Sequence, residues 1–240
     1  MTSRMMRIGL FSDIHGNLTA LRAVDAALAR EAPLDHVIVA GDHLQGGPRP
    51  LEVWQLLTAR GWALIRGNED DALVATDLET RLPDSPSYRQ AFIAQVQWTR
   101  QRLGPAVLEQ LAALPDRWRI ATPAGDLLVV HASPRAIDDR AGGAHNTAAE
   151  VTAAYAGTGA SAIAFGHYHR SFVRPMPFAL LINVASVGLP FDHRPLAAYT
   201  ILTATADGWI VEQRSVPYDA AEEHAAAEAT GMPPWSPDHS

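Results

Sequence analysis

Five polar motifs in this sequence carry side chains that could bind metal ions. The first is Asp13-Ile14-His15, which directly follows the apolar run 8–11. In an extended chain, residues i and i+2 project to the same side, so one carboxylate and one imidazole can face a common point. Such a pair suits Zn, Mn, Fe, Co or Ni. Taken alone, it is more often a helix-entry carboxylate beside a surface histidine, with Asn17 as a helix N-cap.

The other four motifs lie further along the chain and also follow apolar stretches. They are Gly41-Asp42, Gly67-Asn68, His131 and Gly166-His167-Tyr168-His169. Alone, His131 favours a structural interpretation, as a buried histidine at the end of a core strand. Together the motifs supply seven oxygen and nitrogen donors: Asp13, His15, Asp42, Asn68, His131, His167 and His169. These are too many for one tetrahedral zinc ion and enough for two ions that share a carboxylate.

The segments between the motifs predict an α/β fold that brings the motifs together. Apolar residues recur at helical spacing from 18 to 28, and the apolar run 36–40 then leads to Asp42. A strand–helix–strand unit has a right-handed crossover and parallel strands. We therefore expect Asp13 and Asp42 at the same edge of one sheet, where open α/β sheets bind their ligands.

The rest of the chain predicts a helical insertion followed by more strands. Residues 70–114 show helical patterns broken at Gly104-Pro105, which indicate either a cap over a substrate pocket or a structural helix pair covering a sheet edge. Further strands are expected at 62–65, 118–122, 126–130, 161–165, 178–184, 197–203 and 209–216. We expect one domain over residues 1–240, with the insertion at about 70–114 and a C-terminal helix and tail at about 217–240.

Composition excludes several classes of protein. With 48% hydrophobic and 19% charged residues, the chain of 240 residues is typical of globular proteins. The net charge of −7 gives no general attraction to nucleic acid or anionic lipid, so no large duplex is expected as a partner. The absence of cysteine excludes disulfide and thiolate sites. The sequence shows neither a leader nor an apolar run of membrane-spanning length, so we expect a cytoplasmic protein with no membrane partner. The oligomeric state is left open, and a homo-oligomer is one possibility.

As an ordered set, the five motifs resemble those of the calcineurin-like metallophosphoesterases. The segments 12–17 and 183–190 are similar to the small prokaryotic phosphodiesterase branch, and the resemblance runs from about residue 7 to 216. It implies a four-layer α/β/β/α sandwich with a helical insertion and a dinuclear metal centre. By position, one ion would be held by Asp13, His15 and His169, the other by Asn68, His131 and His167, with Asp42 as the bridge.

The resemblance implies hydrolysis of phosphodiester bonds by a hydroxide that bridges two divalent transition-metal ions. Manganese is the first candidate, and Fe, Zn, Co or Ni fit the same donors. Asp42, Asn68 and His131 would be catalytic, and the substrate would be a small phosphorylated or phosphodiester compound. Two alternatives stay open, which are a nucleotidase or dinucleoside polyphosphate hydrolase on the same centre, and a non-catalytic scaffold on this fold.

One position departs from the commonest family pattern. The family's third motif is Gly-Asn-His, whose histidine assists the leaving group, whereas this chain has Glu69 in that place. We therefore expect a preference for phosphodiesters or activated esters whose leaving group needs little protonation. Glu69 itself and His43 are the candidates for the missing proton donor.

The sequence also indicates where the phosphoryl group could bind. Asn17, Arg66, Arg135 and Arg170 are the candidate contacts, although an arginine in such a place is more often a solvated side chain. No Asp-Arg pair follows Gly41-Asp42 as it does in the protein serine/threonine phosphatases, which argues against that function.

Overall fold

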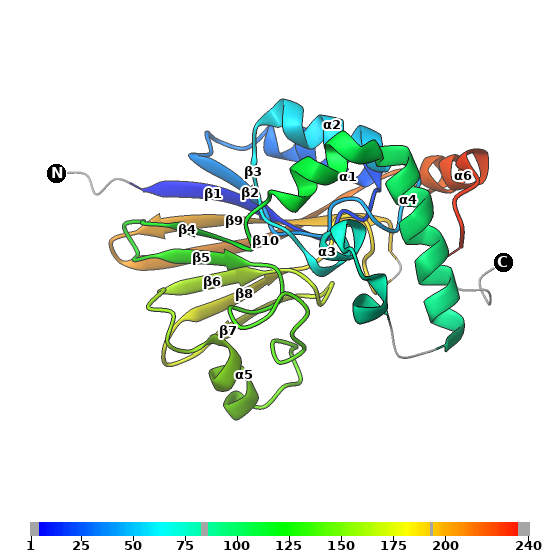
Figure 1. Ribbon diagram of the computed structural model, residues 1–240. Helices are drawn as coiled ribbons and strands as arrows, with labels where there is room; N and C mark the ends of the chain where they lie inside the picture. Colours follow the sequence, from blue (N-terminus) through cyan, green and yellow to red (C-terminus); the bar gives the residue numbers. More distant parts are fainter. Residues whose placement is uncertain (1–4, 83–85, 193, 235–240) are drawn as a thin grey trace.

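Buried apolar strands form two five-stranded sheets that pack face to face, with helices on their outer faces (Figure 1). The computed structural model describes residues 5–82, 86–192 and 194–234. The layers follow the order helix, sheet, sheet, helix, so the predicted α/β/β/α sandwich is confirmed.

The first sheet has the strand order β10-β9-β1-β2-β3. Its strands are β1 (Met6–Phe11), β2 (His36–Val39), β3 (Ala63–Leu64), β9 (Leu196–Thr205) and β10 (Gly208–Pro217). β1, β2 and β3 are parallel, as the strand–helix–strand pattern predicts, whereas β9 runs antiparallel to β1. The carboxyl ends of the three parallel strands therefore lie at one edge of the sheet.

The second sheet has the order β4-β5-β6-β8-β7. Its strands are β4 (Arg117–Ile120), β5 (Leu127–Val130), β6 (Ala162–Phe165), β7 (Ser171–Pro175) and β8 (Leu180–Val184). The predicted hairpin is present as the antiparallel pair β4–β5, and β5, β6 and β8 are parallel. β7 is an edge strand that the sequence did not predict, because it lacks the apolar run of the buried strands.

The helices cover both sheets. They are α1 (Leu18–Leu28), α2 (Pro50–Arg60), α3 (Asn68–Val74), α4 (Pro86–Ala112), α5 (Ala148–Tyr155) and α6 (Ala220–Thr230), with a short 3-10 helix η1 (Leu78–Arg81). α4 is interrupted at the predicted place, since Gly104 has a φ of 71° and a proline follows it. None of the helices in the described ranges has both the length and the apolarity needed to cross a membrane.

Three apolar clusters hold these layers together. The cluster between the sheets includes Ile8, Ile38 and Val129, whose side chains are fully buried. A second cluster joins the first sheet to α1, α2 and α4, and a third joins the second sheet to α5. Burial of apolar area on this scale is the main favourable term in folding, so the sheets form a rigid base for the loops at their ends.

The C-terminal helix α6 is attached to α1 by hydrogen bonds and to Arg49, the residue before α2, by ion pairs. Glu223 accepts hydrogen bonds from the backbone N–H and the hydroxyl of Thr19, the hydroxyl bond being 2.7 Å long. Arg49 pairs with both Glu223 and Glu222. The Glu223 side chain is 11% exposed and that of Glu222 is 49% exposed, so only the first is shielded from water. The part of the predicted tail at 235–240 lies outside the described residues.

The different exposure of Glu223 and Glu222 predicts that the two residues contribute unequally to stability. Glu223→Gln should lower the free energy of unfolding by about 1–2 kcal/mol, because it removes the shielded partner of Arg49 and leaves only the exposed Glu222 as its counter-charge. Glu222→Gln, the matched control on the same helix turn, should cost less than about 0.5 kcal/mol because an exposed ion pair contributes little. Urea unfolding followed by circular dichroism measures both values. Equal losses in the two variants would contradict this role of Glu223.

Candidate metal centre

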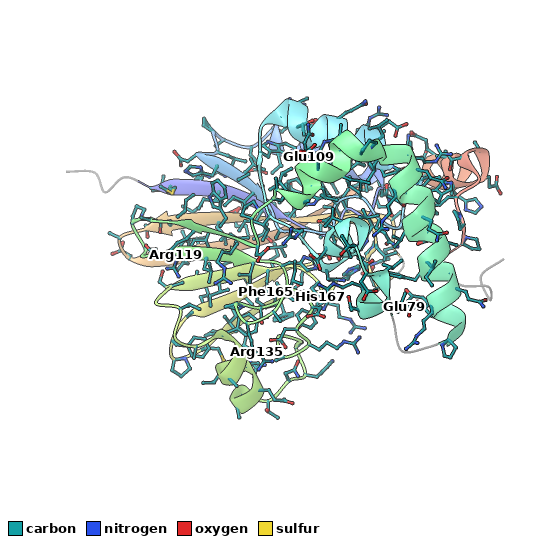
Figure 2. All side chains as sticks on the ribbon, viewed as in Figure 1. Glu79, Glu109, Arg119, Arg135, Phe165 and His167 are labelled. Atoms are coloured by element: carbon teal, nitrogen blue, oxygen red, sulfur yellow. The ribbon has the colours of Figure 1, made fainter. Side chains whose placement is uncertain are left out.

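Loops from both sheets meet where the parallel strands end. Asp13 follows β1, Asp42 follows β2, His131 follows β5, His167 follows β6 and Asn68 begins α3. The loops are tied to each other through the backbone, since Asp13 N–H donates to the Gly41 carbonyl at 3.0 Å. Figure 2 shows His167 near the middle of the molecule, beside α3. The seven predicted donors thus come together, and we call them the candidate metal centre.

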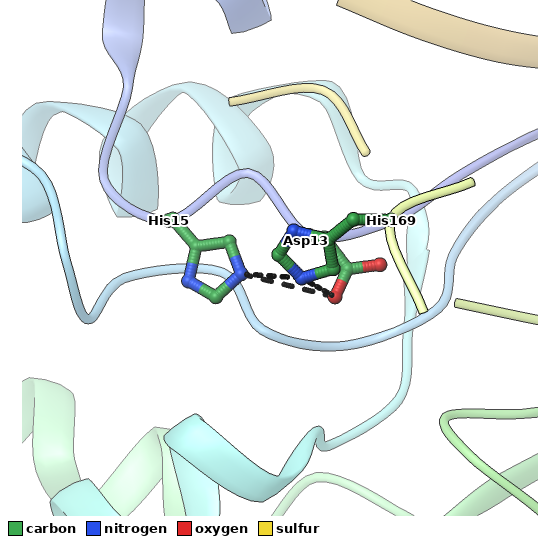
Figure 3. A group of neighbouring side chains, drawn as sticks. All are labelled: Asp13, His15 and His169. Atoms are coloured by element: carbon green, nitrogen blue, oxygen red, sulfur yellow. Dashed lines mark hydrogen bonds and ion pairs between the residues drawn. The ribbon is translucent and has the colours of Figure 1, made fainter. Parts of the chain in front are cut away.

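Asp13, His15 and His169 form one group of donors (Figure 3). The Nε2 atom of His169 lies 3.1 Å from Asp13 Oδ1 and 3.3 Å from the Nε2 atom of His15. All three side chains are buried and point toward one another. Three converging donors of this kind could hold one divalent ion.

A second group forms around Asn68 and His131. Asn68 Oδ1 lies 2.9 Å from His131 Nε2 and 2.8 Å from His167 Nδ1. Asp42 Oδ2 lies 3.3 Å from His131 Nε2 and 4.0 Å from His15 Nε2, so it stands between the two groups. Asp13 belongs to both, because Asp13, Asp42 and His131 also converge.

The histidine orientations fit metal binding. The Nδ1 atoms of His15, His131 and His169 contact the backbone carbonyls of Gln45, Ala40 and Leu189 at 2.9, 2.7 and 2.6 Å. A carbonyl can only accept, so each Nδ1 carries the hydrogen. In the neutral ring the lone pair is then on Nε2, the atom that faces the centre. This is the arrangement by which proteins fix metal-binding histidines.

Charges at the centre favour a cation. Burial by itself lowers the pKa of His15, but the hydrogen bond with Asp13 and the charge of Asp42 raise it to about 9. Burial is likewise outweighed at His131, where Asp42 raises the pKa to about 10. Burial lowers the pKa of His167 to about 4, and the charge of His131 acts in the same direction. The buried carboxylates therefore attract positive charge, which divalent ions would supply.

The backbone at the centre is strained. Asp13, His15, Asp42, His167 and His169 have φ angles of 56°, 50°, 54°, 68° and 54°, in the left-handed region that residues other than glycine rarely adopt. Each such residue costs about 1–3 kcal/mol and persists only where the surrounding structure enforces it. Ala185 is the only other non-glycine residue with a positive φ in the described part of the chain.

Two of the motifs need a glycine because another loop of the centre packs directly against its backbone. A Cβ atom on Gly166 would overlap the side chains of Ser12 and Asp13, and one on Gly67 would overlap Asp42. Glycine is therefore required at Gly166, where loops of the two sheets meet, and at Gly67, where two loops of the first sheet meet.

Glu69 lies directly beside the candidate metal centre. Its backbone N–H donates to Asp42 Oδ1 at 2.8 Å, and its Oε1 accepts from Asn68 Nδ2 at 3.2 Å. Its buried Oε2 has no hydrogen-bond partner among the residues that the structure describes. Burial and the charge of Asp42 raise the pKa of Glu69 to about 8. Burial and the charge of Glu69 raise the pKa of Tyr88, on α4, to about 12. α4 packs against α3, the helix that contains Glu69.

Asp70 ties two loops of the centre, a role that sequence reasoning missed. It accepts from the backbone N–H of His43 at 3.0 Å and from that of Gly67 at 3.0 Å, and its Oδ2 lies 2.6 Å from His43 Nδ1. Both Asp70 and His43 are fully buried. The pair joins the loop of Asp42 to the loop of Asn68. Because Nδ1 of His43 is held by Asp70, the structure gives His43 a role in positioning, and its role as a proton donor stays a prediction.

Three of the four residues predicted to contact the phosphoryl group form hydrogen bonds with other parts of the protein. Asn17 Oδ1 accepts from Ala20 N–H at 2.9 Å and so caps α1, the alternative that the sequence left open, while its Nδ2 donates to Gly188. Arg66 donates to Asp116 and Arg135 donates to Asp139. Arg135 lies on the loop that leads toward α5 (Figure 2). These bonds give the three residues structural roles and leave their contact with substrate an untested prediction.

Arg170 differs from the other three. It is exposed, follows His169 directly, and has no hydrogen bond or ion pair to any residue of 5–82, 86–192 or 194–234. It lines a hollow together with His169. Arg170 is thus the predicted phosphoryl contact that the structure leaves free to bind a ligand.

Comparisons with known proteins agree with this architecture. The sequence model of the calcineurin-like phosphoesterase superfamily domain matches residues 6–207. A metallophosphoesterase from Sphaerobacter thermophilus has 27% identity and a TM-score of 0.72, over 96% of both chains. A hypothetical protein from Pyrococcus horikoshii OT3 has 16% identity and a TM-score of 0.80, over 95% of this chain and 94% of that one.

More distant structures share the fold alone. Vacuolar protein sorting 29 from Cryptosporidium parvum has 12% identity and a TM-score of 0.51, over 89% of this chain and 98% of that one. No curated protein matches the sequence.

The contacts of Asp70 lead to a prediction. Asp70→Asn should weaken Mn²⁺ binding by about 10–100-fold, because an amide cannot accept from all three donors that hold the two loops. Asp71→Asn, at the neighbouring position, removes partly exposed pairs with Arg66 and Arg81, contacts no donor of the centre through these pairs, and serves as the control. Isothermal titration calorimetry with Mn²⁺ measures both affinities. An unchanged affinity in a folded Asp70→Asn variant would show that Asp70 does not position the ligands.

Proposed function

This chain belongs to the calcineurin-like phosphoesterase superfamily, and we propose that it is a metal-dependent phosphodiesterase that uses two divalent ions. The position of Asp42 is the observation that supports this most strongly. Its Oδ2 lies between His131 Nε2 and His15 Nε2, at 3.3 and 4.0 Å, so one carboxylate borders both groups of donors. A carboxylate with two oxygens is suited to join two ions.

Under this proposal the seven donors divide between two ions. Asp13, His15 and His169 would hold one ion, Asn68, His131 and His167 would hold the other, and Asp42 would contact both. When bound, the ions supply a hydroxide nucleophile at neutral pH and neutralise charge on the phosphoryl group. Manganese is the first candidate, and the donors suit Fe, Zn, Co and Ni as well.

The protein's own groups set the charge at the site. Asp13 and Asp42 are the two carboxylates among the seven donors, and Asn68 binds through a neutral amide. Two carboxylates cancel only half the charge of two divalent ions, so the loaded centre keeps a positive charge that attracts a phosphodiester anion. The carbonyls of Gln45, Ala40 and Leu189 hold three imidazoles in place, so little reorganisation is needed during the reaction.

The helical segment 70–114 lies beside the residue that follows Asn68. α4 packs against α3, the helix that contains Glu69, and Arg100 on α4 donates to the Leu73 carbonyl at 2.9 Å, which supports the proposal that this helical segment borders the bound substrate as a cap. Glu69 stands where the family's commonest motif has a histidine, and its Oε2 is free to contact a leaving group.

Metal dependence gives the first test of the proposal. With Mn²⁺, the wild type should hydrolyse bis(p-nitrophenyl) phosphate, chelation should abolish this activity, and about two ions should bind per chain. Asp42→Ala should lower kcat by about a hundredfold or more, since it removes the carboxylate between the ions. Asp126→Asn, which alters an exposed pair with Arg119 on the β4–β5 hairpin, is the control. Hydrolysis that survives chelation, or full activity of Asp42→Ala, would contradict the mechanism.

The leaving group gives the second test. The wild type should cleave an aryl diester faster than an alkyl monoester, because Glu69 replaces the usual histidine donor. Glu69→Gln should slow cleavage of diesters with alkyl leaving groups by about 10–100-fold more than cleavage of p-nitrophenyl diesters, since only the former need a proton. His43→Ala, measured with the same substrates, tests the other candidate. An equal loss across leaving groups would reject proton donation by the residue changed.

A further inference from the structure

An exposed aromatic ring lies against the candidate metal centre. Phe191 stacks on the imidazole of His169, with ring centroids 4.5 Å apart and an angle of 26° between the planes. Its side chain is nevertheless 50% exposed, although large aromatic residues are usually buried. Leu189 already fixes the orientation of His169 through its carbonyl. Support of the imidazole therefore does not explain why a phenyl ring faces solvent here.

Phe191 and Arg170 line two hollows, one of which includes a donor of the candidate metal centre. One hollow, of about 500 Å³, also includes His169, Arg194 and Arg214 among its lining residues. The other, of about 540 Å³, also includes Tyr168 and Phe172. Because the first hollow includes the donor His169, a group that enters it from the metal centre meets both Phe191 and Arg170.

The charge of Arg170 is not balanced within the described part of the protein. Arg194 pairs with Asp192, and Arg214 pairs with Glu31 and Glu212. Arg170 has no such pair, and it is the residue next to His169. An unpaired guanidinium beside an exposed aromatic ring suits a ligand that carries both a phosphate and a flat aromatic group.

We propose that Phe191 and Arg170 form a specificity subsite that binds the nucleobase and the phosphate of a nucleotide ester. The base stacks on the open part of the Phe191 ring, and Arg170 contacts the phosphate charge. This inference rests on the proposed phosphodiesterase function, because it places the reacting phosphoryl group at the candidate metal centre. It narrows the substrate class from phosphodiesters in general to those that carry a nucleoside.

Direct binding tests the subsite independently of turnover. Adenosine 5′-monophosphate and ribose 5-phosphate differ by the base alone, so calorimetry with each on the Mn²⁺-loaded protein isolates the contribution of the base. The nucleotide should bind about tenfold more tightly to the wild type. Phe191→Ala should remove this preference, and Phe191→Tyr should keep it. Arg170→Ala should weaken both ligands by a similar factor, and Arg170→Lys should restore part of the loss.

Three results would overturn the subsite. They are equal affinities of the two ligands for the wild type, an equal weakening of both by Phe191→Ala at unchanged metal content, and binding of neither ligand to a protein that hydrolyses bis(p-nitrophenyl) phosphate. The second would show that Phe191 only supports His169. A protein that prefers the nucleotide through Phe191 but hydrolyses no diester would instead retain the subsite and contradict the proposed function.

Discussion

Left-handed backbone at five of the seven donors is the constraint on which the rest of this structure depends. Asp13, His15, Asp42, His167 and His169 adopt it so that their side chains turn inward at the ends of strands. The strain is maintained because the loops are bonded to each other, for example from His15 N–H to the Asp42 carbonyl at 3.0 Å. Rigid parallel strands beneath the loops leave them no way to relax separately.

The same loops explain how buried charges are tolerated. Asp42 is buried, yet the charge of His131 holds the pKa of this carboxyl below its ordinary value against the effect of burial. Asp70, also buried, is satisfied by three donors from two loops. Buried ionic groups stabilise a fold only when their partners are complete. The centre is therefore a network in which support of the donors and balance of charge use the same contacts.

Much of this arrangement is predictable from sequence because it follows from short-range patterns. Apolar runs that end in a glycine and a polar residue indicate strand ends, and the right-handed crossover places Asp13 and Asp42 at one edge. The features that could not be predicted from the sequence depend on contacts between segments that are far apart in the chain. Asp70 looks like an ordinary acidic residue in the first turn of a helix, and its bond to His43 appears only once the loops meet. The stacking of Phe191 on His169 likewise has no signal in the local sequence.

The pairing of β1 with β9 governs the order in which the protein can be completed during synthesis. β1 leaves the ribosome well before its antiparallel partner β9, since Ile8 pairs with Leu202. Until then one edge of β1 stays unpaired. An unpaired apolar strand is a site for aggregation. A nascent chain that stops before β9 thus carries all seven donors but lacks the strand that pairs with β1, which leads to the first of them.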